Sequence, residues 1–114
     1  MLATAAVVAP VSAAHAGSDE SITVAGGQAT FQAYGEILTA TDTRVDGRCV
    51  TAYLKYVGAS HNSPVVYEHT TACGYGAVSR KNLSLAEGTP VSLQVCYTGG
   101  GQDNQCSHWQ EATA

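Results

Sequence analysis

The sequence predicts an all-β domain: an antiparallel β-sandwich, immunoglobulin-like or closed into a small barrel, of about six or seven strands with two disulfides. Charged residues make up only 12% of the 114 residues, while Gly, Ser, Thr and Tyr are abundant, a composition typical of extracellular β-proteins. Short segments of alternating apolar and polar residues are separated by turns that contain Gly and Asp. The four cysteines fall as two pairs, each bracketing an expected hairpin: Cys49 with Cys73 and Cys96 with Cys106.

Residues 1–16 are predicted to be a signal peptide. They are almost all Ala, Val, Leu, Ser or Thr, carry no charge, and end in Ala14-His15-Ala16, with small residues where a signal peptidase reads. The apolar run is interrupted by Pro10 and is too short for a membrane-spanning helix, although a plain N-terminal anchor is the alternative. We therefore expect cleavage after Ala16, export, and no membrane insertion of the remaining chain. An even cysteine count in an exported domain predicts disulfides.

Residues 17–30 are expected to form a flexible lead or a weak first strand, because Gly, Ser, Asp, Glu and Gln predominate there. Ile22 and Val24 belong to its one short apolar patch, so Ser21–Ala25 is a candidate seventh strand. We expect this segment to engage a partner by adding a strand to the edge of the partner's sheet. The β-sandwich domain itself is assigned to residues 31–114.

Alternation and turn signals predict five strands, at residues 31–41, 49–57, 65–73, 81–85 and 91–97. After the first of these strands, Asp side chains and a Gly at 41–47 turn the chain back. The glycine-rich loop 99–104 leads into a sixth strand. Because side chains alternate along a strand, one face of the second strand carries Val50, Ala52, Leu54 and Tyr56.

The first cysteine pair specifies a register for the hairpin that it closes. If 65–73 folds back on 49–57, the opposed pairs are Cys49 with Cys73, Thr51 with Thr71, and Tyr53 with His69. The same register places Glu68 opposite Leu54 on the apolar side, so a bulge or a shift by one residue is an alternative.

The second cysteine pair also specifies a register for the hairpin that it closes. Folding back about Gly101 places Cys96 opposite Cys106 and Leu93 opposite Trp109. Trp109 would then join the apolar face and the core. The alternative is an exposed tryptophan with a binding role.

The residues that usually carry catalysis or bind metals form no recognisable site in this sequence. There is no Gly-x-Ser-x-Gly motif, and paired cysteines leave no thiol nucleophile. Neither His61, His69 and His108 nor the scattered carboxylates have a spacing that local structure would bring together. The turn with Asp42 and Asp46 lacks the alternating oxygen ligands of a calcium loop. We expect no catalytic residue, no metal and no cofactor.

The candidate binding surface is the outward face of the first disulfide hairpin. Tyr53, Tyr67 and His69 would gather there, and such rings bind proteins or sugars by stacking and hydroxyl hydrogen bonds, although outward tyrosines also simply cover a sheet. Five Lys and Arg stand against nine Asp and Glu, a net charge of −4 without a basic run. This balance argues against nucleic acid or an anionic membrane as the partner.

The segment from Tyr34 to Leu54, with Thr41-Asp42-Thr43-Arg44-Val45-Asp46-Gly47 at its centre, resembles small secreted actinobacterial proteins, as do the Ala-rich leader and the hairpin cysteines. Two groups of this kind are the tendamistat-like α-amylase inhibitors, which are two-disulfide β-sandwiches, and the adaptor subunits of umbrella toxin particles. The Trp-Arg-Tyr triplet of the inhibitors is absent, so no inhibitory residue carries over. The resemblance implies an extracellular adaptor or inhibitor.

Together these observations predict a secreted, non-enzymatic protein that binds an extracellular protein partner. A carbohydrate-binding module, with a glycan as its ligand, is the alternative.

Overall fold

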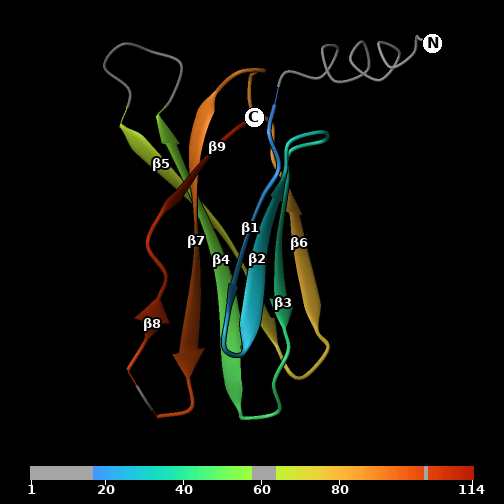
Figure 1. The fold of residues 1–114 in the computed structure, drawn as a ribbon, viewed down its shortest axis with the longest axis vertical. Coiled ribbons are helices and arrows are strands. Elements are labelled where there is room, and N and C mark those ends of the chain that lie inside the picture. The colour runs from blue at the N-terminus through green and yellow to red at the C-terminus, as the bar shows by residue number, and fades with distance from the viewer. Residues whose placement is uncertain (1–16, 58–63, 102) are drawn as a thin grey trace, which may run out of the picture.

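Two antiparallel sheets make up the part of the chain that the computed structural model describes, residues 17–57, 64–101 and 103–114. The strands of these residues are β1 (Glu20–Val24), β2 (Gly27–Gln32), β3 (Ile37–Asp42), β4 (Arg48–Val57), β5 (Val65–Cys73), β6 (Val78–Asn82), β7 (Pro90–Gly99), β8 (Gln105–Cys106) and β9 (Gln110–Thr113). One sheet has the order β1-β2-β3-β6, and the other has the order β5-β4-β7-β8 with β9 also paired to β7 (Figure 1). Within these ranges, no helix has the length and apolar character needed to cross a membrane. The predicted signal peptide, residues 1–16, lies outside them.

The predicted all-β sandwich with two disulfides is confirmed. Disulfides join Cys49 to Cys73 and Cys96 to Cys106, and both lie in the five-stranded sheet. Crosslinks of this kind in a small domain are consistent with an extracellular location. The described residues form more strands than the sequence predicted, for reasons that follow from particular residues.

The core lies between the two sheets and depends on the alternation along β4. Val50, Ala52 and Leu54 are fully buried on the inner face of that strand, as the sequence predicted. The other large, fully buried hydrophobic side chains come from both sheets: Phe31, Leu38, Leu93 and Val95. β4 is paired on both sides, with β5 and with β7, so it is the central strand of its sheet.

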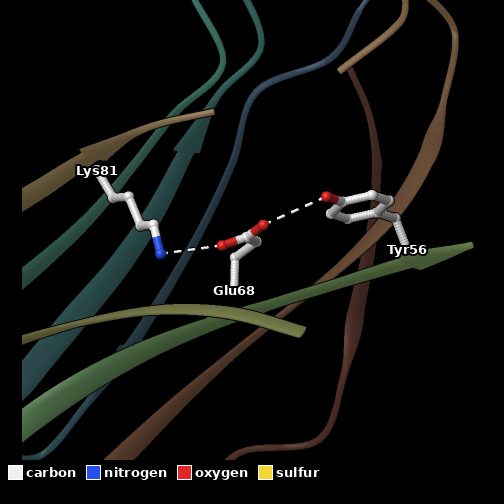
Figure 2. A network of polar contacts seen from close by, with 3 residues as sticks. All are labelled: Tyr56, Glu68 and Lys81. Atoms are coloured by element: carbon white, nitrogen blue, oxygen red, sulfur yellow. Dashed lines mark hydrogen bonds and ion pairs between the residues drawn. The ribbon is translucent and has the colours of Figure 1, made fainter. Parts of the chain in front are cut away.

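The predicted register of β4 and β5 is confirmed over their whole length, including the opposition of Leu54 and Glu68 without a bulge. Glu68 is accommodated on the inner side because it lies at the margin of the sandwich, where the opposite sheet supplies a cation. Lys81 Nζ of β6 lies 2.9 Å from Glu68 Oε1, and the Tyr56 hydroxyl donates a 3.3 Å hydrogen bond to Glu68 Oε2 (Figure 2). Burial, then the charge of Glu68, raises the pKa of Tyr56, so its hydroxyl stays protonated as a donor.

The predicted single strand over residues 31–41 is wrong. The chain instead turns at 33–36, and β2 and β3 pair with each other. Gly35 and Glu36 both adopt positive φ angles, 87° and 52°. The strained Glu36 is held from both sides, because its carbonyl accepts Leu83 N–H at 2.8 Å and its carboxylate accepts Leu85 N–H at 2.9 Å.

The expected strand at 81–85 also lies elsewhere, because β6 is at Val78–Asn82. Leu83 and Leu85, whose alternation suggested a strand, follow β6 and pack as half-buried side chains against the core. Their N–H groups bond to Glu36, as described above, rather than to a neighbouring strand.

Residues 17–30 are part of the sandwich rather than a separate lead, and the alternative of a first strand at Ser21–Ala25 corresponds to β1. They contain β1 and most of β2, so the expected domain boundary at residue 31 falls inside a strand. Ala29 is fully buried. β1 and β2 are joined through Ala25 and Gly26, and Gly26 has a φ of 131° with its Cα close to the Tyr97 ring, where a side chain would collide.

A buried carboxylate ties together two loops at the lower end of the sandwich in Figure 1. Asp42 is fully buried at the end of β3. Its Oδ1 accepts the N–H of Arg44 at 3.1 Å, and its Oδ2 accepts the N–H of Gly74 at 2.9 Å. Asp42 therefore joins the β3–β4 loop to the β5–β6 corner, and its role is structural rather than calcium binding.

Asp42→Ala is expected to lower the free energy of unfolding by about 2 to 4 kcal/mol, because two part-buried hydrogen bonds to a buried, charged acceptor are lost. Asp46→Ala is the matched control, since exposed Asp46 accepts a single N–H, from Arg48. Its cost should stay below about 1 kcal/mol. Urea denaturation of both variants measures the difference, and equal costs would contradict the structural role of Asp42.

The two disulfides should differ in their contribution to stability because they close loops of different length, with sequence separations of 24 and 10 residues. Loop-closure entropy assigns roughly 3.5 kcal/mol to Cys49–Cys73 and roughly 2.8 kcal/mol to Cys96–Cys106. Denaturation of the two paired Cys→Ala variants tests this order. A larger loss for the Cys96/Cys106 variant would show that packing, not loop closure, dominates.

Candidate functional site

Aromatic residues of the first hairpin meet on the outer face of the five-stranded sheet. Tyr53 of β4 lies opposite His69 of β5, and their ring centroids are 5.8 Å apart. One step along the hairpin, Lys55 lies opposite Tyr67, whose side chain is 60% exposed. The structure thus brings together Tyr53, Tyr67 and His69, the three residues that the sequence placed on this face.

The C-terminal segment adds a further ring because its register shifts by one residue. β7 pairs with β8 at Cys96 and Cys106, but it pairs with β9 at Leu93 and Gln110. Two residues of β7 therefore face three residues, 107–109, on the partner side, which is a β-bulge. Ser107 supplies the hydrogen bonds at the bulge. Its N–H donates to Val95 O at 2.9 Å, and its hydroxyl accepts Val95 N–H at 3.1 Å.

The bulge places Trp109 on the outer face, so the predicted core position opposite Leu93 is wrong. A shift by one residue exchanges the two faces of a strand. Trp109 is half-buried, with Lys55 Nζ 4.2 Å from its ring centroid and the Tyr67 ring 6.3 Å away. Because β7 lies between β4 and β9, the indole must reach across β7 to contact Lys55.

We call this surface the aromatic face; it comprises Tyr53, Lys55, Tyr67, His69 and Trp109. Its rings are tilted rather than coplanar, by 39° between Tyr53 and His69 and by 56° between Tyr67 and Trp109. The Lys55 ammonium covers one side of the indole in a cation–π contact. The face therefore combines large apolar area with a positive charge and hydroxyl donors.

A hollow of about 470 Å³ adjoins the aromatic face at Lys55 and Tyr67. Its walls also include apolar side chains of both hairpin strands, Val57 and Val65, which are 56% and 48% exposed. Glu111 of β9 also lines the hollow and contributes a carboxylate. The hollow extends the exposed apolar area of the aromatic face toward the end of the hairpin.

Two predicted binding residues lie away from this face. Ile22 and Val24 are in β1, in the other sheet, and their side chains pack against the core of this chain. They do not form a segment that leaves the domain to join a partner's sheet. His61 lies outside the described residues, and within those described no three His, Cys, Asp or Glu side chains are grouped as metal ligands would be.

Sequence reasoning missed Lys55 and gave an exposed Trp109 only as the alternative to a core position, although one signal for the outward position was present. The disulfide requires Cys106 to face outward, whereas the small apolar Ala112 and Ala114 suit an inward face and are buried. Residues 106, 112 and 114 are all even-numbered, so in a regular strand their side chains would share one face. Such a strand cannot direct Cys106 outward and the two alanines inward. That conflict requires an extra residue between them, which is the bulge.

Comparison of the chain with protein-family models, with curated proteins and with solved structures found no match. The functional inference therefore depends on the geometry of the aromatic face.

Trp109→Ala is expected to lower the free energy of unfolding by about 1 kcal/mol, the scale of an exposed cation–π and ring contact. Phe31→Ala, which empties a fully buried site, should cost about 3 to 5 kcal/mol. Urea denaturation compares the two. Trp109 is the only tryptophan of the chain, so the folded protein should also emit as a partly solvated indole. A Trp109→Ala cost equal to that of Phe31→Ala would place the ring in the core.

Proposed function

We propose that this chain is a secreted, non-enzymatic binding protein that contacts another protein through the aromatic face. The contact among Trp109, Tyr67 and Lys55 carries this proposal. Tryptophan and tyrosine dominate the binding energy of protein interfaces because each buries a large, rigid surface and keeps a polar group for hydrogen bonding. A bulge that turns the only tryptophan outward supports binding rather than core packing as its role.

The tilt of the rings favours a protein over a sugar polymer. Stacking on a flat run of sugar rings is served by aromatic side chains that share a plane, whereas Tyr67 and Trp109 are inclined by 56°. Lys55 also occupies one side of the indole. An uneven surface with a charge at its centre is suited to the irregular surface of a folded partner.

Export is supported by the two disulfides together with the apolar, uncharged residues 1–16. A non-enzymatic role is supported by the cysteines, since all four are paired in the two disulfides and none is left as a thiol nucleophile. An adaptor and an inhibitor both act by such contact, and both fall within the proposal.

A carbohydrate-binding module is the second candidate, and the hollow beside Tyr67 is the observation that favours it. A glycan end could enter the hollow while Trp109 or Tyr67 stacks on one sugar ring.

The proposal is tested with the purified chain carrying a photo-crosslinking amino acid at position 92 or at position 34, incubated with culture fluid of the source cells. Ser92 faces Lys55 in the register of β4 and β7, on the aromatic face, whereas Tyr34 is a 74% exposed residue of the β2–β3 turn. One protein should be crosslinked from position 92 and not from position 34. Crosslinking from position 34 alone would place the interface elsewhere.

The crosslinked protein is then purified and titrated with variants. Tyr67→Ala and Trp109→Ala should each weaken its binding at least about 30-fold, as hot-spot truncations do. Tyr34→Ala, which removes a tyrosine that is more exposed than Tyr67 and lies away from the face, should leave binding within about twofold. Retention on polysaccharide gels that Trp109→Ala abolishes, without protein binding, would favour the glycan.

A further inference from the structure

Among the described residues, the five-stranded sheet ends in a long strand edge that pairs with no further strand. β5 is the outermost strand and pairs with β4 alone, in an uninterrupted register from Val65 to Cys73. In the part of the chain that the structure describes, no other strand pairs with it. An edge of this length presents a row of backbone donors and acceptors on which another strand can form.

The disulfide indicates which backbone groups point outward. Cys49 and Cys73 are directly opposed with their Cα atoms 4.4 Å apart, the spacing of a pair that does not exchange backbone hydrogen bonds. Because hydrogen-bonded and non-bonded pairs alternate, the other odd-numbered residues of β5 also direct their N–H and C=O groups away from β4. They are Val65, Tyr67, His69 and Thr71, whose side chains also lie on the outer face.

The other sheet edges are short or protected. β8 has two residues, and β1 has five and is preceded by the bridge from Ser18 to Thr113. β6 carries exposed Arg80 and Lys81, charges that discourage edge pairing. β5 has no Lys, Arg or Pro in its nine residues and is rich in Val, Tyr and Thr.

The charges around the β5 edge complement an acidic strand. Lys55 lies on the outer face, and Arg80 and Lys81 lie on β6, which packs beside β5. Glu68 is already paired with Lys81, and Glu111 lines the hollow beside Lys55, so two carboxylates stand against three cations. The margin is thus positive in a chain of net charge −4. Two copies meeting edge to edge would bring like charges together, which disfavours self-pairing.

We propose that a partner protein supplies an extended, acidic segment that adds to the free edge of β5 as a further strand of the five-stranded sheet. The backbone of the segment bonds to Val65, Tyr67, His69 and Thr71, and its alternate side chains lie on the aromatic face beside Tyr67 and His69. This inference rests on the proposed function, because it uses the same face and adds how the partner is held.

The probe is a phage library of random nine-residue peptides selected against the folded chain. Enriched peptides should be rich in Glu or Asp and in β-branched residues. Methylating single backbone nitrogens of a selected peptide should reduce affinity at least tenfold at every second position and little at the positions between them. Tolerance of methylation at every position, basic selected peptides, or no enrichment would overturn the proposal.

Two variants of the chain give the complementary test. Thr71→Pro removes an outward N–H without breaking the β4 ladder, because proline is tolerated on an edge strand at such a position. Thr71→Pro should lower the affinity for the selected peptide at least tenfold. Thr71→Val, which removes only the hydroxyl that contacts Thr51, should leave affinity within about twofold. The peptide methylation series decides the proposal if Thr71→Pro does not fold.

The outcomes separate this inference from the proposed function. If Tyr67→Ala weakens binding of the crosslinked partner while Thr71→Pro does not, the aromatic face binds the partner but strand addition is wrong. If neither does, the proposed function fails as well. A concentration-dependent dimer in sedimentation that Thr71→Pro abolishes would identify a second copy, not an acidic partner, as the occupant.

Discussion

The opposition of Cys49 and Cys73 is the constraint on which the rest of the five-stranded sheet depends. In an antiparallel pair, one fixed opposition determines every other pair and therefore which side chains face inward. Here it directs Val50, Ala52 and Leu54 into the core and Tyr53 and Lys55 to the surface. The inward and outward faces of β4 also determine those of β7, because β4 pairs with that strand along nearly its whole length.

The register also imposes a cost, which the opposite sheet relieves. Placing Leu54 inward places Glu68 inward as well, and a buried carboxylate without partners is unfavourable. The neighbouring margin of the other sheet supplies Lys81, and β4 itself supplies the Tyr56 hydroxyl (Figure 2). The contact thus connects the two sheets at the side where β5 and β6 are the edge strands of the described part of the chain. Thr70 and Ser79 reinforce that seam with a 2.6 Å hydrogen bond between their hydroxyls.

The sequence was sufficient where covalent chemistry and alternation agreed. The first hairpin was predicted with its register because one opposition satisfied both cysteines, while the inward position of Glu68 left a bulge or a shift open. Prediction failed where a local irregularity decided the outcome. Glu36 takes a positive φ that non-glycine residues rarely adopt, and long-range bonds to Leu83 and Leu85 hold it there. The alternation of Cys106 and Ala112 required an extra residue between them, but the position of the bulge depends on Ser107 replacing a backbone acceptor, which no local signal specifies.

The hairpin of β4 and β5 is covalently closed at both ends: the chain itself joins the strands at one end, and Cys49–Cys73 joins them at the other. Residues 49–73 therefore form a ring. An edge strand can ordinarily peel away and exchange into a second molecule, the route to domain-swapped dimers and to fibres. β5 cannot do so while the disulfide is intact. Oxidation of these two cysteines thus converts an edge that could be exchanged into a fixed template, and reduction of this one bond would make the exchange possible again.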